Sequence, residues 1–150
     1  MDQKLNGKIA LVTGASSGQG AAEARLFAEA GARVFLADIA DAAGEAEAAS
    51  IRDEGGDAHF RHLDVADEAN WSALVEAIGS EFGGLNILVN NAGIPLRGGN
   101  VTNTSLEDWN RLMSVNLTGA FLGIRETAPL IRDSGGGAIV NTGSIAGLTG

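Results

Sequence analysis

Short apolar runs alternate with amphipathic segments five times along the chain, and this alternation restricts the fold more than any other feature. Each run ends at glycine or a small polar residue, as strands of a buried parallel sheet do. The segments between them carry apolar residues at helical spacing. Strands that alternate with helices across short loops are joined in parallel by right-handed crossovers. The sequence therefore predicts one α/β domain over residues 1–150, with a doubly wound parallel sheet in three α/β/α layers.

The expected elements follow this alternation in chain order. Ser105 is expected to cap a long helix that has Pro129 in its last turns, and Asp67 is a better N-cap than Asp64 for the helix before it. Trp71 and Trp109 are expected to pack helices onto the sheet. Strands are predicted over residues 8–13, 32–38, 58–65, 85–93 and 136–144, and further helices over residues 18–30, 41–54 and 67–82.

Composition excludes several classes of function. The net charge of −9 argues against a broad surface for nucleic acid. The chain has no cysteine, which excludes disulfides, thiol catalysis and thiolate metal sites, and no other metal site is expected. The first apolar run is too short for a signal peptide or a membrane span, so a soluble, cytoplasmic protein without a membrane partner is expected.

A glycine cluster follows the first predicted strand. Gly14, Gly18 and Gly20 lie between that strand and its helix, where backbone N–H groups and the helix dipole can receive a pyrophosphate. The spacing is wider than the G-x-G-x-x-G dinucleotide fingerprint. Taken alone, the cluster is equally compatible with an ordinary turn between a strand and a helix.

Asp38 ends the second predicted strand, near the distance at which dinucleotide-binding folds place an acid on the adenosine ribose. A carboxylate accepts hydrogen bonds from a diol and repels a phosphate. Ile39 follows, with no adjacent cation to balance that charge. The pair favours NAD(H) over NADP(H); the alternative is a solvated acid at a strand end.

Five motifs carry a resemblance to one family. "TGASSGQG", "LDV", "NNAG", "SVNLTGAF" and "IVNTGS" occur in the order and spacing of the short-chain dehydrogenases/reductases, with Asp38 between the first two. The chain resembles this family from Gly7 onward, and most closely its hydroxysteroid-dehydrogenase-type members. The resemblance implies a Rossmann-type fold, here truncated after the fifth strand, and a homo-oligomer, dimer or tetramer, of the complete protein.

The resemblance also implies a role for each motif. Asn90 would tie neighbouring strands together, Asn116 would mark a break in its helix and hold a proton-relaying water, and Ser144 would hold the substrate oxygen. The alternatives are an Asn-rich turn, an asparagine that satisfies a neighbouring loop, and a turn serine. The implied cofactor-binding residues are Gly14, Ser16, Ser17, Gly18, Gln19, Gly20, Asp38, Ile39, Asp64, Val65, Asn90, Ala92 and Gly93.

The family's chemistry needs a tyrosine and a lysine four residues later. The 150 residues contain no tyrosine, and Lys4 and Lys8, the only lysines, precede the glycine loop. We therefore expect this chain to be the N-terminal part of an NAD(H)-dependent enzyme that interconverts a secondary alcohol and a ketone. Two alternatives stay open: a non-catalytic, redox-sensing dinucleotide-binding module, and a different Rossmann-type enzyme such as a methyltransferase.

Overall fold

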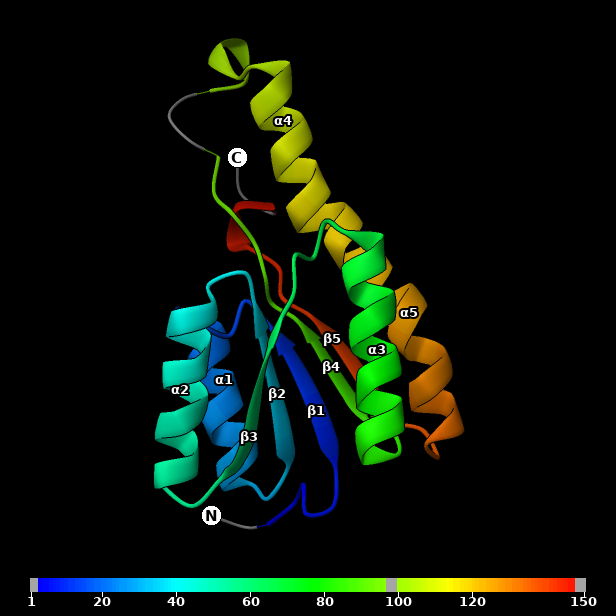
Figure 1. Cartoon of the computed structure of the whole chain (residues 1–150). Helices are drawn as coiled ribbons and strands as arrows, with labels where there is room; N and C mark the ends of the chain where they lie inside the picture. Colours follow the sequence, from blue (N-terminus) through cyan, green and yellow to red (C-terminus); the bar gives the residue numbers. More distant parts are fainter. Residues whose placement is uncertain (1–2, 97–99, 148–150) are drawn as a thin grey trace.

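A computed structural model describes residues 3–96 and 100–147, which form a parallel sheet with helices on both faces (Figure 1). The 5-stranded sheet has the order β3-β2-β1-β4-β5. The strands are β1 (Ile9–Thr13), β2 (Arg33–Asp38), β3 (Asp57–His62), β4 (Ile87–Asn90) and β5 (Ala138–Asn141). The helices are α1 (Gly18–Glu29), α2 (Asp41–Asp53), α3 (Glu68–Phe82), α4 (Leu106–Met113) and α5 (Gly119–Asp133). A π-helical turn (Ser114–Thr118) joins α4 to α5, and short 3₁₀ turns cover Val101–Asn103 and Ile145–Gly147.

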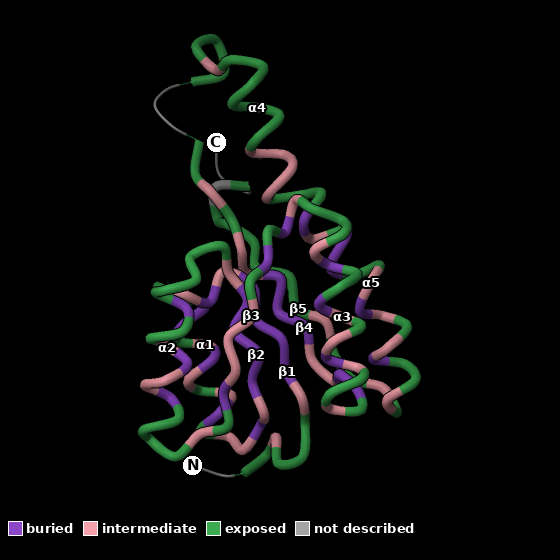
Figure 2. The backbone as a smooth tube through the Cα atoms, in the orientation of Figure 1, coloured by how far each residue is buried: buried purple, intermediate pink, exposed green. Residues whose placement is uncertain are grey.

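The sheet separates two cores, because successive side chains of a strand point to opposite faces. Val12 and Leu36 face α1 and α2, whereas Leu11 and Phe35 face α3 and α5, and all four are fully buried. Both faces of the central strands are thus covered, which explains their continuous apolar sequence. Figure 2 shows the buried segments concentrated in the sheet and on the inner sides of the helices. The predicted α/β/α fold is confirmed.

The order in which the chain adds strands to the sheet reverses beside β1, although all strands run parallel. From β1 the chain proceeds to β2 and β3 on one side, then crosses to β4 and β5 on the other. The connections on the two sides run over opposite faces, so a crevice opens at the carboxyl ends of β1 and β4. Open α/β sheets bind their ligands at such a point.

Expectations about the ends of three strands and about one tryptophan are wrong. The fourth strand ends at Asn90 and not at residue 93, and the fifth ends at Asn141 and not at residue 144. The third strand ends at His62 and not at residue 65, since Asp64 starts a turn in which its side chain accepts the Ala66 N–H at 2.9 Å. Trp109 does not pack against the sheet: it lies on α4, which projects beyond the carboxyl edge of the strands (Figure 1), and it is 48% exposed. Trp71, in contrast, is fully buried, as expected.

The predicted helix caps are confirmed. Asp67 caps α3 by accepting the N–H groups of Ala69 and Asn70 at 2.8 and 3.1 Å. Ser105 caps α4 by accepting the N–H of Asp108 at 3.0 Å. None of the helices among the described residues combines the length and the apolar character that a membrane crossing needs.

Candidate functional site

The glycine loop follows β1 and packs tightly against the loop after β4. Gly14 has φ +65°, and a Cβ there would lie 2.8 Å from the Cα of Ala92. A Cβ at Gly20 would overlap the carbonyl oxygen of Gly14 and lie 2.6 Å from Nδ2 of Asn91. These two glycines are therefore required by close approach of backbone to backbone, which holds α1 against the two central strands.

Thr13 and Asn91 fasten the two loops together. The Thr13 hydroxyl donates to the carbonyl of Val89 at 3.3 Å and accepts the N–H groups of Asn91 and Ala92 at 3.1 and 3.0 Å. The Asn91 amide donates to the carbonyl of Thr13 at 3.0 Å. Neither residue is among the predicted site residues; the signal for Thr13 is a hydroxyl that ends an otherwise apolar, buried strand.

The N-terminus of α1 is open to a ligand. Ser17 occupies its N-cap position, yet no side chain caps the helix there and its first turn contains no acid. Helices α3 and α4 differ, because each has a capping side chain and an acid in its first turn. The first N–H groups of α1 thus remain unmatched by side chains, and they can receive an anion such as a pyrophosphate.

The Asp38 carboxylate lies beside this loop, at the end of β2. Its Oδ2 accepts both the N–H and the hydroxyl of Ser16, at 3.1 and 2.8 Å, and its Oδ1 accepts the N–H of Ala40 at 3.0 Å. A carboxylate offers about four acceptor positions. Since three are used, Asp38 retains capacity for a ligand hydroxyl while the protein fixes its orientation.

A cavity of about 380 Å³ extends from the glycine loop across the ends of β2, β3 and β4 to α4 and the π-helical turn. It brings together many residues that the sequence predicts for the cofactor. These are Gly14, Asp38, Ile39, Asp64, Val65, Ala92 and Gly93. Residues from four separate segments of the chain thus line one cleft, as a dinucleotide site requires.

Asn90 faces the other side of β4 and is 7% exposed. Its amide donates to the side-chain oxygen of Asn141 on β5 at 2.9 Å and to the carbonyl of Ala120 in α5 at 3.3 Å. Gly123 makes room for it, since a Cβ at Gly123 would lie 2.5 Å from Asn90 Oδ1. Asn90 therefore ties β4 to β5 and α5; its partner Asn141 is not among the predicted residues.

Asn116 lies in the π-helical turn between α4 and α5, so the helix is interrupted where the family resemblance implies a break. Its side chain pairs with the backbone of Ile94: Oδ1 accepts the N–H at 2.8 Å and Nδ2 donates to the carbonyl at 2.9 Å. These bonds hold the segment after β4 beside the helix. Single π-helical turns occur frequently at functional sites.

A second cavity, of about 420 Å³, adjoins Asn116 and shares Val65, Ala92 and Val115 with the first. Asn90, Asn141 and Thr142 also line it. The two cavities meet along the carboxyl ends of the strands, one toward β3 and the other toward β5.

Six predicted residues lie outside both cavities, five of them at the glycine loop and one after β5: Ser16, Ser17, Gly18, Gln19, Gly20 and Ser144. Ser144 is exposed and follows β5 at the carboxyl edge, immediately before the 3₁₀ turn Ile145–Gly147. Ser17 and Gln19 are exposed at the start of α1, and the Gln19 amide donates to Glu23 at 2.9 Å. Their expected contacts with cofactor or substrate stay predictions.

The residues at the first cavity have the chemistry that a dinucleotide site needs. The cavity has a close-packed glycine turn at one end, an uncapped helix N-terminus beside it and an oriented carboxylate with acceptor capacity to spare. The pyrophosphate would be held by the first N–H groups of α1, and the ribose by Asp38. Ala92 and Gly93, which also line the cavity, would leave space beside the ribose.

Comparison with known proteins agrees with this geometry. The chain is 45% identical over its whole length to a 3-alpha-(or 20-beta)-hydroxysteroid dehydrogenase of Mycobacterium tuberculosis, of which it covers 56%. It is 44% identical over 148 residues to the 2,5-dichloro-2,5-cyclohexadiene-1,4-diol dehydrogenase LinX of Sphingobium indicum, and covers 59% of it. It is 43% identical over 147 residues to the cyclopentanol dehydrogenase of Comamonas testosteroni, with 58% covered.

The chain thus spans somewhat more than half the length of the curated relatives that it matches, while nearly all of its own residues are covered in each comparison. The sequence profile of the short chain dehydrogenase family matches residues 8–150. On fold, cleft and sequence together, the chain belongs to the short chain dehydrogenase family.

Proposed function

We propose that the protein is an NAD(H)-dependent oxidoreductase that interconverts a secondary alcohol and a ketone. The observation that carries the proposal is the cleft at the carboxyl ends of the strands, where Asp38 faces the uncapped start of α1. A bound nicotinamide cofactor would supply the hydride chemistry, in which hydride passes between the alcohol carbon and the nicotinamide ring. The hydroxyl proton leaves separately to a base.

The chain's own residues divide this task. The glycine loop and Asp38 bind and orient the cofactor. Ser144 would hold the substrate oxygen by a hydrogen bond, at the edge of the sheet where the second cavity lies. Asn116 would support the route of the proton, and its pairing with Ile94 fixes its position. The tyrosine that exchanges the proton, and its lysine, would lie outside these 150 residues.

The names of the relatives favour a cyclic alcohol. Hydroxysteroid, cyclohexadienediol and cyclopentanol each carry the hydroxyl on a ring carbon. We infer a ring-bearing secondary alcohol as the substrate class. NAD(H) is preferred over NADP(H), because a carboxylate at Asp38 accepts ribose hydroxyls and repels a ribose phosphate.

The test uses the protein at its natural length. Binding of NADH is measured by fluorescence titration, and oxidation of cyclopentanol, cyclohexanol and a hydroxysteroid in the presence of NAD is followed by the absorbance of the reduced nicotinamide. Binding together with turnover of a cyclic alcohol is expected. Binding without turnover of any secondary alcohol would favour the redox-sensing module, and absence of binding would overturn the proposal.

The intact mass of the protein from its native source is a second measurement. A mass well above that of the 150 residues, with a tyrosine and a lysine soon after Gly150, would support the catalytic assignment. The expected cytoplasmic location and homo-oligomeric state stay predictions.

A further inference from the structure

Arg111 differs from the other arginines whose surroundings the structure describes. Among the arginines within residues 3–96 and 100–147, Arg111 is the one whose guanidinium has no carboxylate at ion-pair distance. The arginines that do have such a partner are Arg25, Arg33, Arg52, Arg61, Arg125 and Arg132. The chain has a net charge of −9, so acidic side chains outnumber basic ones. An exposed arginine placed at random would therefore be expected to have an acidic neighbour.

The position of Arg111 suggests what its charge is for. It lies on the last turn of α4 and lines the 380 Å³ cofactor cavity, opposite the ends of β2 and β3. Two carboxylates, of Asp38 and Asp64, line the same cavity. Arg111 is the one cationic side chain among the described residues that line it, so it is the group that can offset their charge at a ligand.

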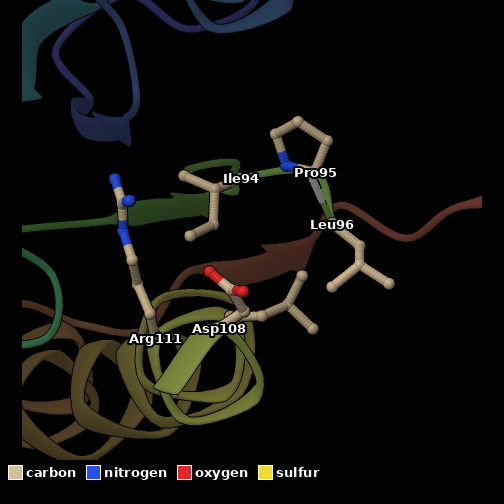
Figure 3. A pocket seen from close by; sticks show the side chains of 6 residues that line it. Ile94, Pro95, Leu96, Asp108 and Arg111 are labelled. Carbon is tan, nitrogen blue, oxygen red and sulfur yellow. The ribbon is translucent and has the colours of Figure 1, made fainter. Parts of the chain in front are cut away.

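The neighbours of Arg111 leave its guanidinium free to turn to the cavity. Figure 3 shows the side chain extending from α4 alongside Ile94, away from Leu96. Asp108, one turn earlier, is engaged in the helix cap, where its carboxylate accepts the Ser105 hydroxyl at 2.7 Å. The Arg111 carbonyl accepts the Ser114 hydroxyl at 2.8 Å, which fixes the backbone at this point.

The residues that line this end of the cavity indicate which part of a ligand would bind there. Leu63, Val65 and Ile39 line it with apolar surface, while Asp64 supplies a carboxylate. Apolar walls with one polar edge suit a flat heterocycle, and the ribose acid Asp38 is its neighbour. A guanidinium stacks on the face of an aromatic ring and is attracted by its π-electrons.

We propose that Arg111 is a cofactor-binding residue whose guanidinium covers the adenine ring from the α4 side, opposite the ends of β2 and β3. This inference rests on the proposed function, because it presumes that the cleft binds a dinucleotide. It adds a contact that neither the glycine loop nor Asp38 supplies. Arg111 would thus help to select a nucleotide that carries adenine over a mononucleotide that carries another base.

The experiment replaces the flat cation and compares ligands that contain different halves of the cofactor. Arg111→Met keeps a stem of similar length and removes the guanidinium. Arg132→Met is the matched control: it removes one positive charge from the end of α5, where Arg132 pairs with its neighbour Asp133 at 2.8 Å. Dissociation constants are measured for NADH, AMP and nicotinamide mononucleotide, with the protein at its natural length.

Arg111→Met is expected to raise the dissociation constants for NADH and AMP by about fivefold, and to leave that for nicotinamide mononucleotide unchanged. Arg132→Met should change none of the three. Arg111→Lys, which keeps the charge and loses the flat group, should also bind AMP more weakly than the original protein. Thermal unfolding of each variant establishes that it is folded, as the exposed position of Arg111 leads us to expect.

The outcomes separate this inference from the proposed function. If the unsubstituted protein binds NADH, and Arg111→Met binds NADH and AMP as tightly as the unsubstituted protein does, the adenine contact is wrong and the proposed function stands. Equal weakening of AMP and nicotinamide mononucleotide would also overturn it, since only the general charge of the cleft would then matter. If the unsubstituted protein fails to bind NADH, both the proposed function and this inference fail.

Discussion

Asp38 connects the protein's own glycine loop with the proposed ribose of the cofactor. The residue accepts the N–H and hydroxyl of Ser16 with one oxygen, which anchors the loop before α1, and the N–H of Ala40 with the other. The Asp38 carboxylate is therefore oriented before a ligand arrives, and this side chain need not be ordered on binding. Such preorganisation strengthens binding by lowering its entropic cost.

Replacing Asp38 by Ala should reduce the preference for NAD(H) over NADP(H) by roughly tenfold or more, because an oriented acceptor for the ribose hydroxyls and a charge that repels the 2′-phosphate are both lost. The ratio of kcat/KM with the two cofactors measures this. Asp53→Ala is the control, since it removes the same charge from the exposed end of α2. An unchanged ratio in Asp38→Ala would refute the ribose assignment.

Gly20 offers a second test at the residue scale. A methyl group at this position would overlap the Gly14 carbonyl and crowd the Asn91 amide, so Gly20→Ala should destabilise the protein by about 2 kcal/mol and weaken dinucleotide binding. Gly79→Ala is the matched helical control: its Cβ would meet Leu130 at an ordinary 3.5 Å, and alanine favours a helix by about 1 kcal/mol. Chemical denaturation measures both. Equal stabilities would contradict the close packing of the loop.

At the scale of the elements, the π-helical turn between α4 and α5 bonds directly to the segment after β4. Asn116 is placed by this turn so that both polar atoms of its amide meet the Ile94 backbone. An uninterrupted α-helix would present a different face of the following residues. The turn therefore sets the position of α5 relative to the strands as well as that of the loop.

Asn116→Ala should release the Ile94 amide and speed its hydrogen exchange by at least about tenfold, because that N–H loses its acceptor. The cofactor should also bind more weakly, since the loop that includes Ala92 and Gly93 is loosened. Asn110→Ala, on the exposed surface of α4, is the control and should leave the exchange of Ile94 as it was. Unaltered exchange in both variants would mean that the pairing does not hold the loop.

The α3 cap is a simpler test of an element. Asp67→Ala removes an acceptor for two N–H groups and should lower the free energy of unfolding by about 1 kcal/mol. Glu76→Ala, an exposed change in the middle of α3, should have little effect. If the two variants are equally stable, the cap contributes nothing.

The periodicity of the sequence predicts elements well where apolar spacing is regular, and less well at strand ends and beyond the sheet. Trp71 and Trp109 both occupy helices, yet only Trp71 faces a strand, because α4 projects past the carboxyl edge. The third strand ends three residues before the apolar pattern does, since Asp64 forms a turn. Local spacing cannot distinguish these cases, because each depends on where other elements lie.

The candidate site shows the same limit. Glycine spacing and the strand-end acid mark Gly14 and Asp38, which local rules can identify. Thr13 and Asn91 act through bonds between residues far apart in sequence, and Arg111 is distinguished by a partner that it lacks. No short motif contains such information.

At the scale of the whole molecule, the strands inside the sheet are much better covered than the border strand β5. β1 and β2 lie inside it and are almost fully buried, whereas β5 forms one border and is largely exposed. Ile139 packs into the core on the α5 side, so Val140 points to the opposite face, where it is 48% exposed. An apolar border strand can pair with another chain.

A polypeptide of residues 1–150 should therefore aggregate less when Val140 is replaced by Lys, because a charge on a border strand disfavours pairing between sheets. Static light scattering as a function of concentration measures this. Val101→Lys is the control: Val101 is 81% exposed and lies in a 3₁₀ turn outside the sheet. An equal benefit from both substitutions would contradict a role for the β5 border.

The bonds around the Thr13 hydroxyl also bear on how the protein is made. They join residues 76 to 79 positions apart, whereas α1 and β2 follow β1 directly in the chain. Contacts of such separation form slowly, since a long loop must close first. A ribosome adds roughly ten residues per second, so several seconds pass between the emergence of the glycine loop and that of Asn91. We therefore expect a nascent chain to gain its affinity for dinucleotides late. That affinity should appear only when β4 has joined β1, and not when the glycine loop first emerges.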